Sequence, residues 1–208
     1  MTPRITAVMA ALMVIQGCAT MDQEECITSD WHAVGFEDGA RGYPVDRISR
    51  HRKACAQHGI TTDLGAYRQG LDEVLRHYCT AQNGFNVGSS GSSYAGVCPE
   101  DLADDFELAY SEGKRLHDLD RRVRSAETRI DALERQVADL DQQIDSHEKT
   151  IIASGTDNLE RARLLLEIKD LVDHREDLED EIEDLEHERA ASRQELEEYR
   201  ETVAYSER

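Results

Sequence analysis

The chain has 208 residues and a formal net charge of −20, because 44 acidic side chains outnumber 24 basic ones. A protein that binds nucleic acid must neutralise phosphates with Lys and Arg, so this balance argues against a nucleic-acid partner. It also argues against attachment to anionic lipid through the overall charge. Such a balance is typical of a well-solvated surface that resists aggregation.

The composition divides the chain into two helical parts. All five cysteines, all three prolines and the only tryptophan lie within residues 1–112, together with eleven of the thirteen glycines. Residues 113–208 contain no cysteine or proline, and their apolar side chains recur every three or four positions, as in a coiled coil. We therefore expect an all-α protein, with a small disulfide-stapled helical domain at 30–112 followed by a long coiled coil at 113–208.

Residues 1–17 predict a secretory signal peptide. Arg4 precedes an unbroken apolar run, ITAVMAALMVI, at residues 5–15. The run is too short to cross a bilayer as a helix, which needs about 20 residues, but it suits the apolar region of a signal peptide. We expect this segment to be removed on export.

Residues 15–18 (IQGC) resemble the lipobox of bacterial lipoproteins, in which the cysteine is acylated, although Gln16 stands where a small residue is usual. The alternative is an ordinary signal peptide with an incidental Cys18. The cysteine count favours acylation, because it leaves an even set that can pair. By resemblance to the Gram-negative sorting rule, Ala19 after the acylated cysteine implies the periplasmic face of the outer membrane. We expect a lipoprotein of the cell envelope that is anchored by palmitate or similar acyl chains.

Several short helices are predicted between the acylated cysteine and the coiled coil, after a tether that ends at residue 29. Pro44 suits the first turn of a helix that Gly59 closes. Thr62 or Asp63 can cap the next helix. The apolar side chains of that helix share one face: Leu64, Tyr67, Leu71, Val74, Leu75 and Tyr78.

A loop is expected at residues 81–97, which are rich in Gly and Ser, before Pro99 begins another helix. One helical turn separates an aromatic residue from a glycine in three places: Trp31 and Gly35, Tyr67 and Gly70, and Tyr110 and Gly113. A glycine inside a helix lowers the stability of that helix by about 1 kcal/mol relative to alanine, so we expect another interaction of the glycine to compensate for this loss. We interpret these glycines as places where another backbone packs closely, in preference to ligand contacts.

The remaining cysteines are Cys26, Cys55, Cys79 and Cys98, and they permit three disulfide pairings. Cys79 and Cys98 flank the expected loop, so we expect them to close it and to leave Cys26 with Cys55. An exported protein can form such bonds, which contribute about 2–4 kcal/mol to a domain with few large apolar side chains.

Zinc is the alternative use of these cysteines, but the chain has no Cys-x2-Cys or paired His spacing. We therefore expect no metal and no cofactor. The histidines of this part are scattered and accompany no nucleophile motif, so they are interpreted as surface or packing residues: His32, His51, His58 and His77.

A series of short motifs within residues 26–117 resembles a family of bacterial lipoproteins known only as a domain of unknown function. The motifs occur in this order: Asp30-Trp31-x3-Gly35-x2-Asp38-Gly39-x2-Gly42, Ala54-Cys55-Ala56-x-His58-Gly59, Tyr67-x2-Gly70, Tyr78-Cys79-Thr80, Asn83-Gly84-Phe85, Gly88, Tyr94-x-Gly96-Val97-Cys98-Pro99 and Tyr110-x2-Gly113. The resemblance implies an exported lipoprotein. It implies no reaction, so no catalytic residue follows from it.

Two apolar seams follow, each with alternating steps of three and four residues. The first consists of Leu116, Leu119, Val123, Ala126, Ile130, Leu133, Val137, Leu140, Ile144, His147 and Ile151. The second consists of Leu164, Ile168, Leu171, Arg175, Leu178, Ile182, Leu185, Arg189, Ser192, Leu196, Tyr199 and Val203. Three polar residues in these seams, Arg175, Arg189 and His147, reduce stability. Either their long side chains extend out of the seam to solvent, or they fix the register or indicate a further partner helix, and the sequence leaves both interpretations open.

Residues 153–157 (ASGTD) separate the two seams and predict a turn, so we expect an antiparallel hairpin. Residues 113–130 carry a net charge of +3 and residues 176–208 a net charge of −10. Folding back places these segments side by side, whereas a parallel arrangement would place residues 131–152, with a net charge of −4, against the −10 segment. The attraction between opposite charges favours the hairpin.

These features predict an envelope lipoprotein that binds or scaffolds a protein partner through its coiled coil, without being an enzyme. The alternative is a cell-wall-binding or glycan-processing module that uses the loop at 81–98. Against an enzyme, the sequence contains no recognisable nucleophile, metal or phosphate-loop motif, and no small-molecule substrate is indicated. We expect a membrane attachment through lipid and a protein partner.

Overall fold

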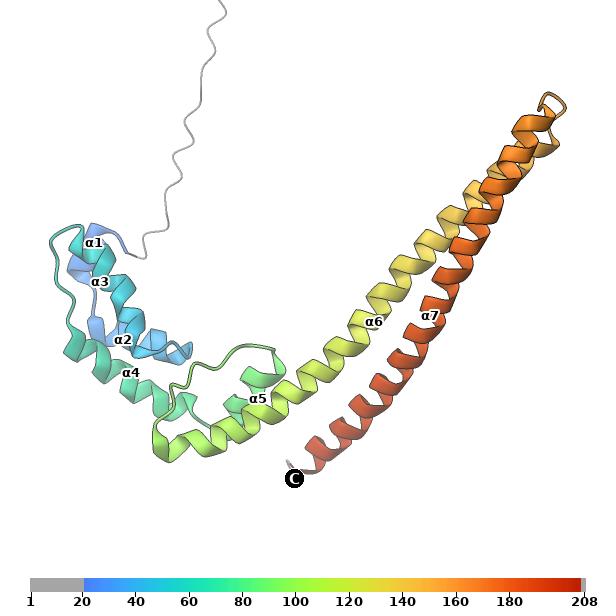
Figure 1. Cartoon of the computed structure of the whole chain (residues 1–208). Helices are drawn as coiled ribbons and strands as arrows, with labels where there is room; N and C mark the ends of the chain where they lie inside the picture. The colour runs from blue at the N-terminus through green and yellow to red at the C-terminus, as the bar shows by residue number, and fades with distance from the viewer. Residues whose placement is uncertain (1–20, 207–208) are drawn as a thin grey trace, which may run out of the picture. The chain divides into compact units, whose positions relative to one another are not determined.

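The computed structural model describes residues 21–206, and within them it is helical and contains no strand (Figure 1). The elements are α1 (Gln23–Thr28), α2 (Trp31–Ala40), the 3₁₀ helix η1 (Val45–Arg47), α3 (Ile48–Ala56), α4 (Leu64–Tyr78), α5 (Ala81–Ser89), α6 (Glu100–Ile152) and α7 (Asn158–Ser206). The all-α prediction is therefore confirmed. Among these residues, no helix has both the length and the apolar character needed to span a bilayer.

The chain forms two compact units. Unit 1 contains the described residues up to 79 together with 95–103, and unit 2 contains residues 80–94 and those from 104 onward. The composition predicts a boundary between the helical domain and the coiled coil at residues 112 and 113, and this point lies inside the continuous helix α6. Helix α5 belongs with the long helices of unit 2.

Side-chain caps begin the helices of unit 1. The Asp30 carboxylate accepts a hydrogen bond from the backbone N–H of His32 at 3.0 Å, at the start of α2. The Asp63 carboxylate accepts one from the N–H of Ala66 at 2.9 Å, so Asp63 is the N-cap of α4, one of the two predicted candidates. Such caps satisfy N–H groups that have no partner inside the helix.

The helix expected to begin at Pro44 is shorter than predicted. A 3₁₀ turn follows Pro44, and α3 begins only at Ile48 and ends at Ala56. Gly59 then adopts a φ of +71°, a left-handed conformation that glycine tolerates best.

Helices α2 and α4 approach each other through reciprocal glycines. A Cβ on Gly35 would lie 1.9 Å from the carbonyl oxygen of Tyr67, and a Cβ on Gly70 would lie 1.9 Å from that of His32. No side chain other than hydrogen fits at either place. The packing interpretation of these two glycines is therefore confirmed.

Replacing Gly70 by Ala should destabilise unit 1 by about 1–3 kcal/mol, because the new methyl group overlaps a backbone oxygen that cannot move independently of α2. Urea unfolding followed by the fluorescence of Trp31, the only tryptophan, measures the effect. Gln69→Ala changes the exposed neighbouring position in α4 and should shift stability by less than about 0.5 kcal/mol. Equal effects of the two substitutions would contradict the close contact.

The loop expected at residues 81–97 is wrong over its first half, because Ala81–Ser89 is helix α5. Its glycines meet α6 in the way that Gly35 meets α4: a Cβ on Gly84 would lie 2.3 Å from the carbonyl oxygen of Phe106, and one on Gly88 would lie 2.2 Å from that of Tyr110. Glycine disfavours an isolated helix, but here it permits close packing onto α6 that offsets the local cost.

Both disulfides join the cysteines paired in the prediction. Cys26 in α1 is bonded to Cys55 in α3, with Cα atoms 5.5 Å apart. The tether expected to end at residue 29 is therefore wrong over Gln23–Thr28, because these residues form α1 and the disulfide fastens them to α3. Cys79, after α4, is bonded to Cys98, with Cα atoms 5.6 Å apart. Both bonds lie within unit 1.

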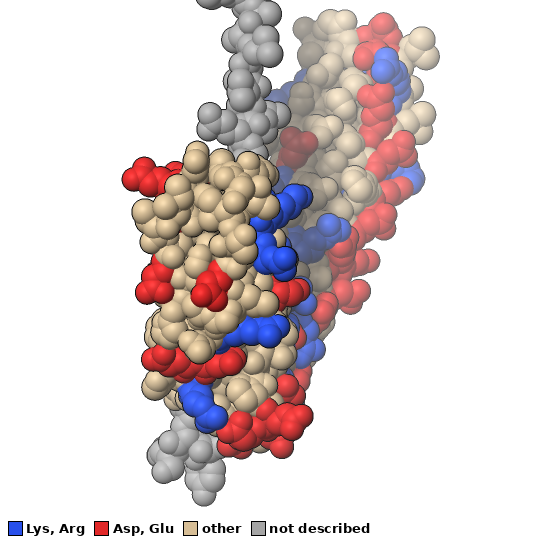
Figure 2. All heavy atoms as spheres, turned by 90° about the vertical axis from the view of Figure 1, so that its left-hand side faces the viewer, with Lys and Arg blue, Asp and Glu red and all other residues tan. Residues whose placement is uncertain are grey.

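Helices α6 and α7 form the predicted antiparallel hairpin, and Figure 1 shows α7 folding back from the turn beside α6, whose first part lies next to α5 instead. The 49 residues of α7 correspond to a rod of about 70 Å. The space-filling view shows acidic side chains in a nearly continuous column along the visible edge of the hairpin (Figure 2). Most of the negative charge of the chain is thus displayed to solvent.

The connection between the two helices is closed by local hydrogen bonds. The Asp157 carboxylate accepts from the N–H groups of Leu159 and Glu160, both at 2.9 Å, and so caps α7. The Arg161 guanidinium donates to the carbonyl oxygen of Ala153 at 2.9 Å, and thereby ties the start of α7 to the residue after α6. The predicted turn at residues 153–157 is confirmed.

Candidate functional site

A buried carboxylate joins four elements of unit 1. The Tyr67 hydroxyl of α4 donates to Oδ2 of Asp38 in α2 at 2.8 Å, and Nε2 of His51 in α3 lies 2.9 Å from the same oxygen. The Arg47 Nε, in η1, lies 3.9 Å from Oδ1. Asp38 is only 5% exposed, so these groups replace the water that an ionised carboxylate requires.

The histidine of this cluster has two aromatic neighbours. The centroid of its ring lies 6.3 Å from that of Trp31 and 6.3 Å from that of Tyr67, and both pairs of rings are tilted. An ionised carboxylate can only accept hydrogen bonds, so the contact with Asp38 assigns the proton to Nε2. The other ring nitrogen, Nδ1, is buried and has no hydrogen-bond partner among the described residues.

This arrangement packs helices together, and among the described residues the printed polar contact of the His51 ring is with the Asp38 carboxylate and not with a serine, threonine or cysteine. The interpretation of His51 as a packing residue agrees with its burial, although the sequence did not reveal its partner. Asp38 could have been singled out from its place in the glycine-rich motif. Its partners could not, because α3 and α4 bring them from positions thirteen and twenty-nine residues away.

The phenol of Tyr67 is fully buried. Burial, followed by the hydrogen bond to Asp38, raises the pKa of Tyr67 well above its ordinary value. Because the folded pKa exceeds the unfolded one, the stabilisation is complete below the ordinary tyrosine pKa of about 10. It is lost as the pH rises from that value through the folded pKa.

Tyr67→Phe should cost about 1–3 kcal/mol of stability at neutral pH, because it removes a donor from a buried carboxylate. Urea unfolding monitored at Trp31 gives the value. Tyr43→Phe is the matched control, since the Tyr43 ring lies under the Arg47 guanidinium at 4.2 Å and the substitution keeps that ring. The difference between the two variants should stay constant up to about pH 9 and shrink in more alkaline solution. A Tyr67→Phe protein as stable as its control would contradict the role of the cluster.

In unit 2, the two seams meet in the order that an antiparallel hairpin requires. One buried cluster consists of Leu119, Val123 and Leu196, and Leu116 and Tyr199 pack against it. A second cluster lies nearer the turn and consists of Leu133, Leu140 and Leu178, with Leu171 among the residues packed on it. Residues early in α6 therefore contact residues late in α7, and residues nearer the turn in α6 contact residues nearer the turn in α7.

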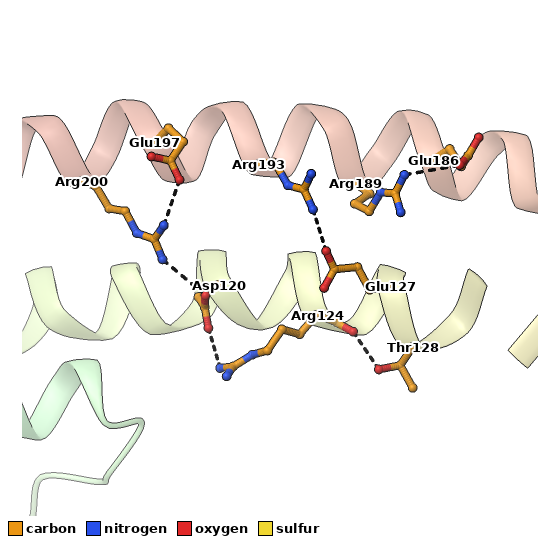
Figure 3. A network of polar contacts seen from close by, with 9 residues as sticks. All are labelled: Asp120, Arg124, Glu127, Thr128, Glu186, Arg189, Arg193, Glu197 and Arg200. Atoms are coloured by element: carbon orange, nitrogen blue, oxygen red, sulfur yellow. Dashed lines mark hydrogen bonds and ion pairs between the residues drawn. The ribbon is translucent and has the colours of Figure 1, made fainter. Parts of the chain in front are cut away.

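Ion pairs across the rod follow the same order. Glu127 of α6 lies 2.7 Å from Arg193 of α7, and Asp120 lies 3.6 Å from Arg200 (Figure 3). Arg129 also reaches across to α7, at 2.8 Å from Glu181. These pairs are exposed and contribute at most about 1 kcal/mol each to stability. Their main effect is to favour the register in which α7 packs along α6.

The polar seam residues have partners within the hairpin. The Arg175 guanidinium lies 3.2 Å from Asp141 of α6, and the Arg189 guanidinium lies 3.3 Å from Glu186. His147 lies 3.8 Å from Glu167. Their side chains are about one-third exposed, so they extend out of the seam to acidic groups, the first of the two interpretations left open.

Large apolar side chains are exposed at the closed end of the hairpin. We call this set the tip cluster: Ile152, Leu159, Leu165 and Leu166, which are between 58% and 82% exposed. Leu159 and Leu166 are seven residues apart, so they lie on one stripe of α7, with the exposed Ala162 between them. The seam of α7 uses Leu164 instead, which is buried.

The charge around the tip cluster differs from that of the C-terminal part of α7. Residues 149–169 contain four basic and three acidic side chains, whereas residues 176–208 contain four and fourteen. An exposed apolar surface without strong charge is the kind that associates with other molecules. The run Leu164-Leu165-Leu166 was the sequence signal for it, because one seam position needs only one leucine.

The predicted site residues are placed as follows. Cys18 lies outside the described residues, and the four other cysteines form the two disulfides. Of the segment 81–98, the helical part packs on α6, and the carbonyl of Ser92 accepts a hydrogen bond from the Tyr110 hydroxyl at 3.1 Å. In the described part of the chain, no three His, Cys, Asp or Glu side chains are grouped to hold a metal ion.

Residues 30–115 match a family described as "Protein of unknown function (DUF2799)". The match extends from the cap of α2 into α6, and so includes the Asp38 cluster and all the glycine contacts described above. This part of the chain is therefore similar to a domain of unknown function, as its motifs indicated. No curated protein and no solved structure matches the chain.

Proposed function

We propose that this protein is a lipid-anchored scaffold of the cell envelope, whose hairpin binds an apolar helix of a partner protein through the tip cluster. One observation carries the proposal: four large apolar side chains are exposed at the end of α6 and in the first turns of α7, while buried clusters fill the seam between the helices. Exposed leucines scattered singly would need no explanation, but a cluster at one end of a rod does.

The spacing of the tip cluster suits a helix as its partner. Leu159 and Leu166 present two successive turns of one stripe, onto which an amphipathic helix can lay its own apolar stripe. Burying a leucine side chain contributes about 1.5–3 kcal/mol, so a few such contacts sustain a specific interaction. The near-neutral charge around them avoids the repulsion that an acidic partner would meet elsewhere on the rod.

The envelope setting rests on the signal-like residues 1–17 and on the lipobox resemblance at Cys18. The two disulfides support it, because such bonds persist in oxidising compartments. The periplasmic face of the outer membrane is the location that Ala19 implies. A cell-wall-binding or glycan-processing role would have to use residues 90–98, because residues 81–89 are packed helix; glycan strands retained on purification would favour that role.

A photo-reactive residue placed at Leu166 should crosslink to one or a few envelope proteins in intact cells. Placed at Leu108, which is 64% exposed but outside the tip cluster, the same residue should give no such adduct. Leu159→Gln in the first protein should reduce the adduct at least about tenfold, because each buried leucine contributes more than 1 kcal/mol. Adducts of equal yield at both positions, or adducts with lipid alone, would contradict a helical protein partner.

Cys18→Ser should abolish acylation and release the protein from the membrane fraction. Acyl chains anchor because each buried methylene contributes about 0.8 kcal/mol, and several chains on one cysteine make attachment stable. Metabolic labelling with a palmitate analogue and membrane fractionation report the two effects. A wild-type protein that carries no acyl label would remove the anchor from the proposal without affecting the tip cluster.

A further inference from the structure

Helix α3 is basic although the chain as a whole is strongly acidic. Its nine residues, ISRHRKACA, include Arg50, Arg52 and Lys53 and no acidic residue, whereas the chain carries a net charge of −20. In the space-filling view, Lys and Arg side chains gather along one edge of the nearer unit (Figure 2). Overall charge therefore does not describe the local surface.

An open pocket of about 370 Å³ lies beside α3. Its lining combines two cationic side chains with three hydroxyl groups and contains no carboxylate: Ser49, Arg52, Lys53, Ala56, Ile60, Thr61 and Thr62. Guanidinium, ammonium and hydroxyl groups are the donors that proteins use to bind phosphate oxygens. The chemistry of the lining thus fits a phosphate group, with Ala56 and Ile60 supplying apolar surface beside it.

The two cations are available to a ligand. Among the described residues, no acidic group lies within ion-pair distance of Arg52 or Lys53, and both side chains belong to exposed residues. Arg47 differs, because it faces the Asp38 carboxylate at 3.9 Å. The nearest acid in sequence on the other side of the pocket is Asp63, whose carboxylate caps α4.

The covalent structure holds this pocket close to the proposed anchor. Gln23 is five positions after Cys18, and a fully extended chain spans at most about 3.6 Å per position. With the short helical rise to Cys26, the disulfide therefore lies within about 25 Å of the anchored cysteine. The Cα of Cys55 is 5.5 Å from that of Cys26, and Arg52 lies one turn before Cys55 in α3.

We propose that this pocket binds the phosphate of an anionic phospholipid headgroup in the leaflet that holds the anchor. The inference rests on the proposed acylation of Cys18 for its choice of a lipid phosphate. It differs from the expectation based on the net charge of the whole chain. Screening limits the effect of exposed charges to about 8–10 Å, so the local charge of the pocket matters more than the sum over the chain. The acyl anchor at Cys18 and the headgroup bound in the pocket would attach unit 1 to the membrane at two points, and two points of attachment orient it on the membrane surface.

The test uses the chain from residue 19 onward, which contains every described residue and no acyl group. It should sediment with vesicles of equimolar phosphatidylglycerol and phosphatidylcholine and not with vesicles of phosphatidylcholine alone. Arg52→Gln with Lys53→Gln should weaken that binding at least about tenfold, since basic residues near an anionic surface each contribute severalfold. Arg68→Gln with Arg121→Gln changes the charge equally at exposed positions and should weaken it less than about twofold.

Three outcomes would overturn the proposal. Equal loss in both double variants would show a general charge effect without a site. Binding of inorganic phosphate that depends on Arg52, without binding to the anionic vesicles, would show a site for soluble phosphate. Wild-type protein that fails to distinguish the two vesicle types would show no headgroup site. Circular dichroism and disulfide mapping verify that the variants fold, and the unacylated chain keeps this test independent of the anchor and of the tip cluster.

Discussion

The fold of this protein depends most on close contacts between helix backbones, which are possible only because glycine has no side chain. Gly35 and Gly70 bring α2 and α4 together, and Gly88 meets α6 in the same way, with the carbonyl oxygen of Phe85 lying 2.2 Å from where a Cβ on Gly113 would be. Each unit is thus built around a helix pair whose separation is fixed by the absence of side chains. In unit 1 that separation allows Tyr67 to reach the Asp38 carboxylate.

This mode of packing requires compensation. Helical glycines cost about 1 kcal/mol each relative to alanine, and small residues bury little apolar surface. The buried polar cluster at Asp38 and the disulfides offset part of that cost, and Cys26–Cys55 fastens a helix of only six residues that could not hold its place alone. The hairpin needs neither device, because its seam supplies continuous apolar contact along α6 and α7.

Local signals in the sequence were sufficient for much of the fold. The cap at Asp63, the two seams and the turn before Asn158 depend on neighbours in sequence or on strict periodicity. The cysteine pairs followed from the loop between Cys79 and Cys98, which left Cys26 and Cys55 to each other. Helix α5 was missed because its glycines are favourable only against α6, a contact that no local pattern records. The Asp38 cluster and the pocket beside α3 were missed for the same reason, since each is assembled from separate helices or from a helix and the loop after it.

The fold-back of α7 along α6 places the exposed leucines at a closed end, and the proposed binding role depends on it. Spin labels at the exposed positions Arg121 and Gln194 measure it directly in a protein whose native cysteines are disulfide-bonded or, at Cys18, replaced. Helices packed side by side have axes about 8–10 Å apart, so the label distance should be a few tens of ångströms at most. A continuous helix through residues 153–157 would separate the labels by roughly 110 Å and would contradict the hairpin.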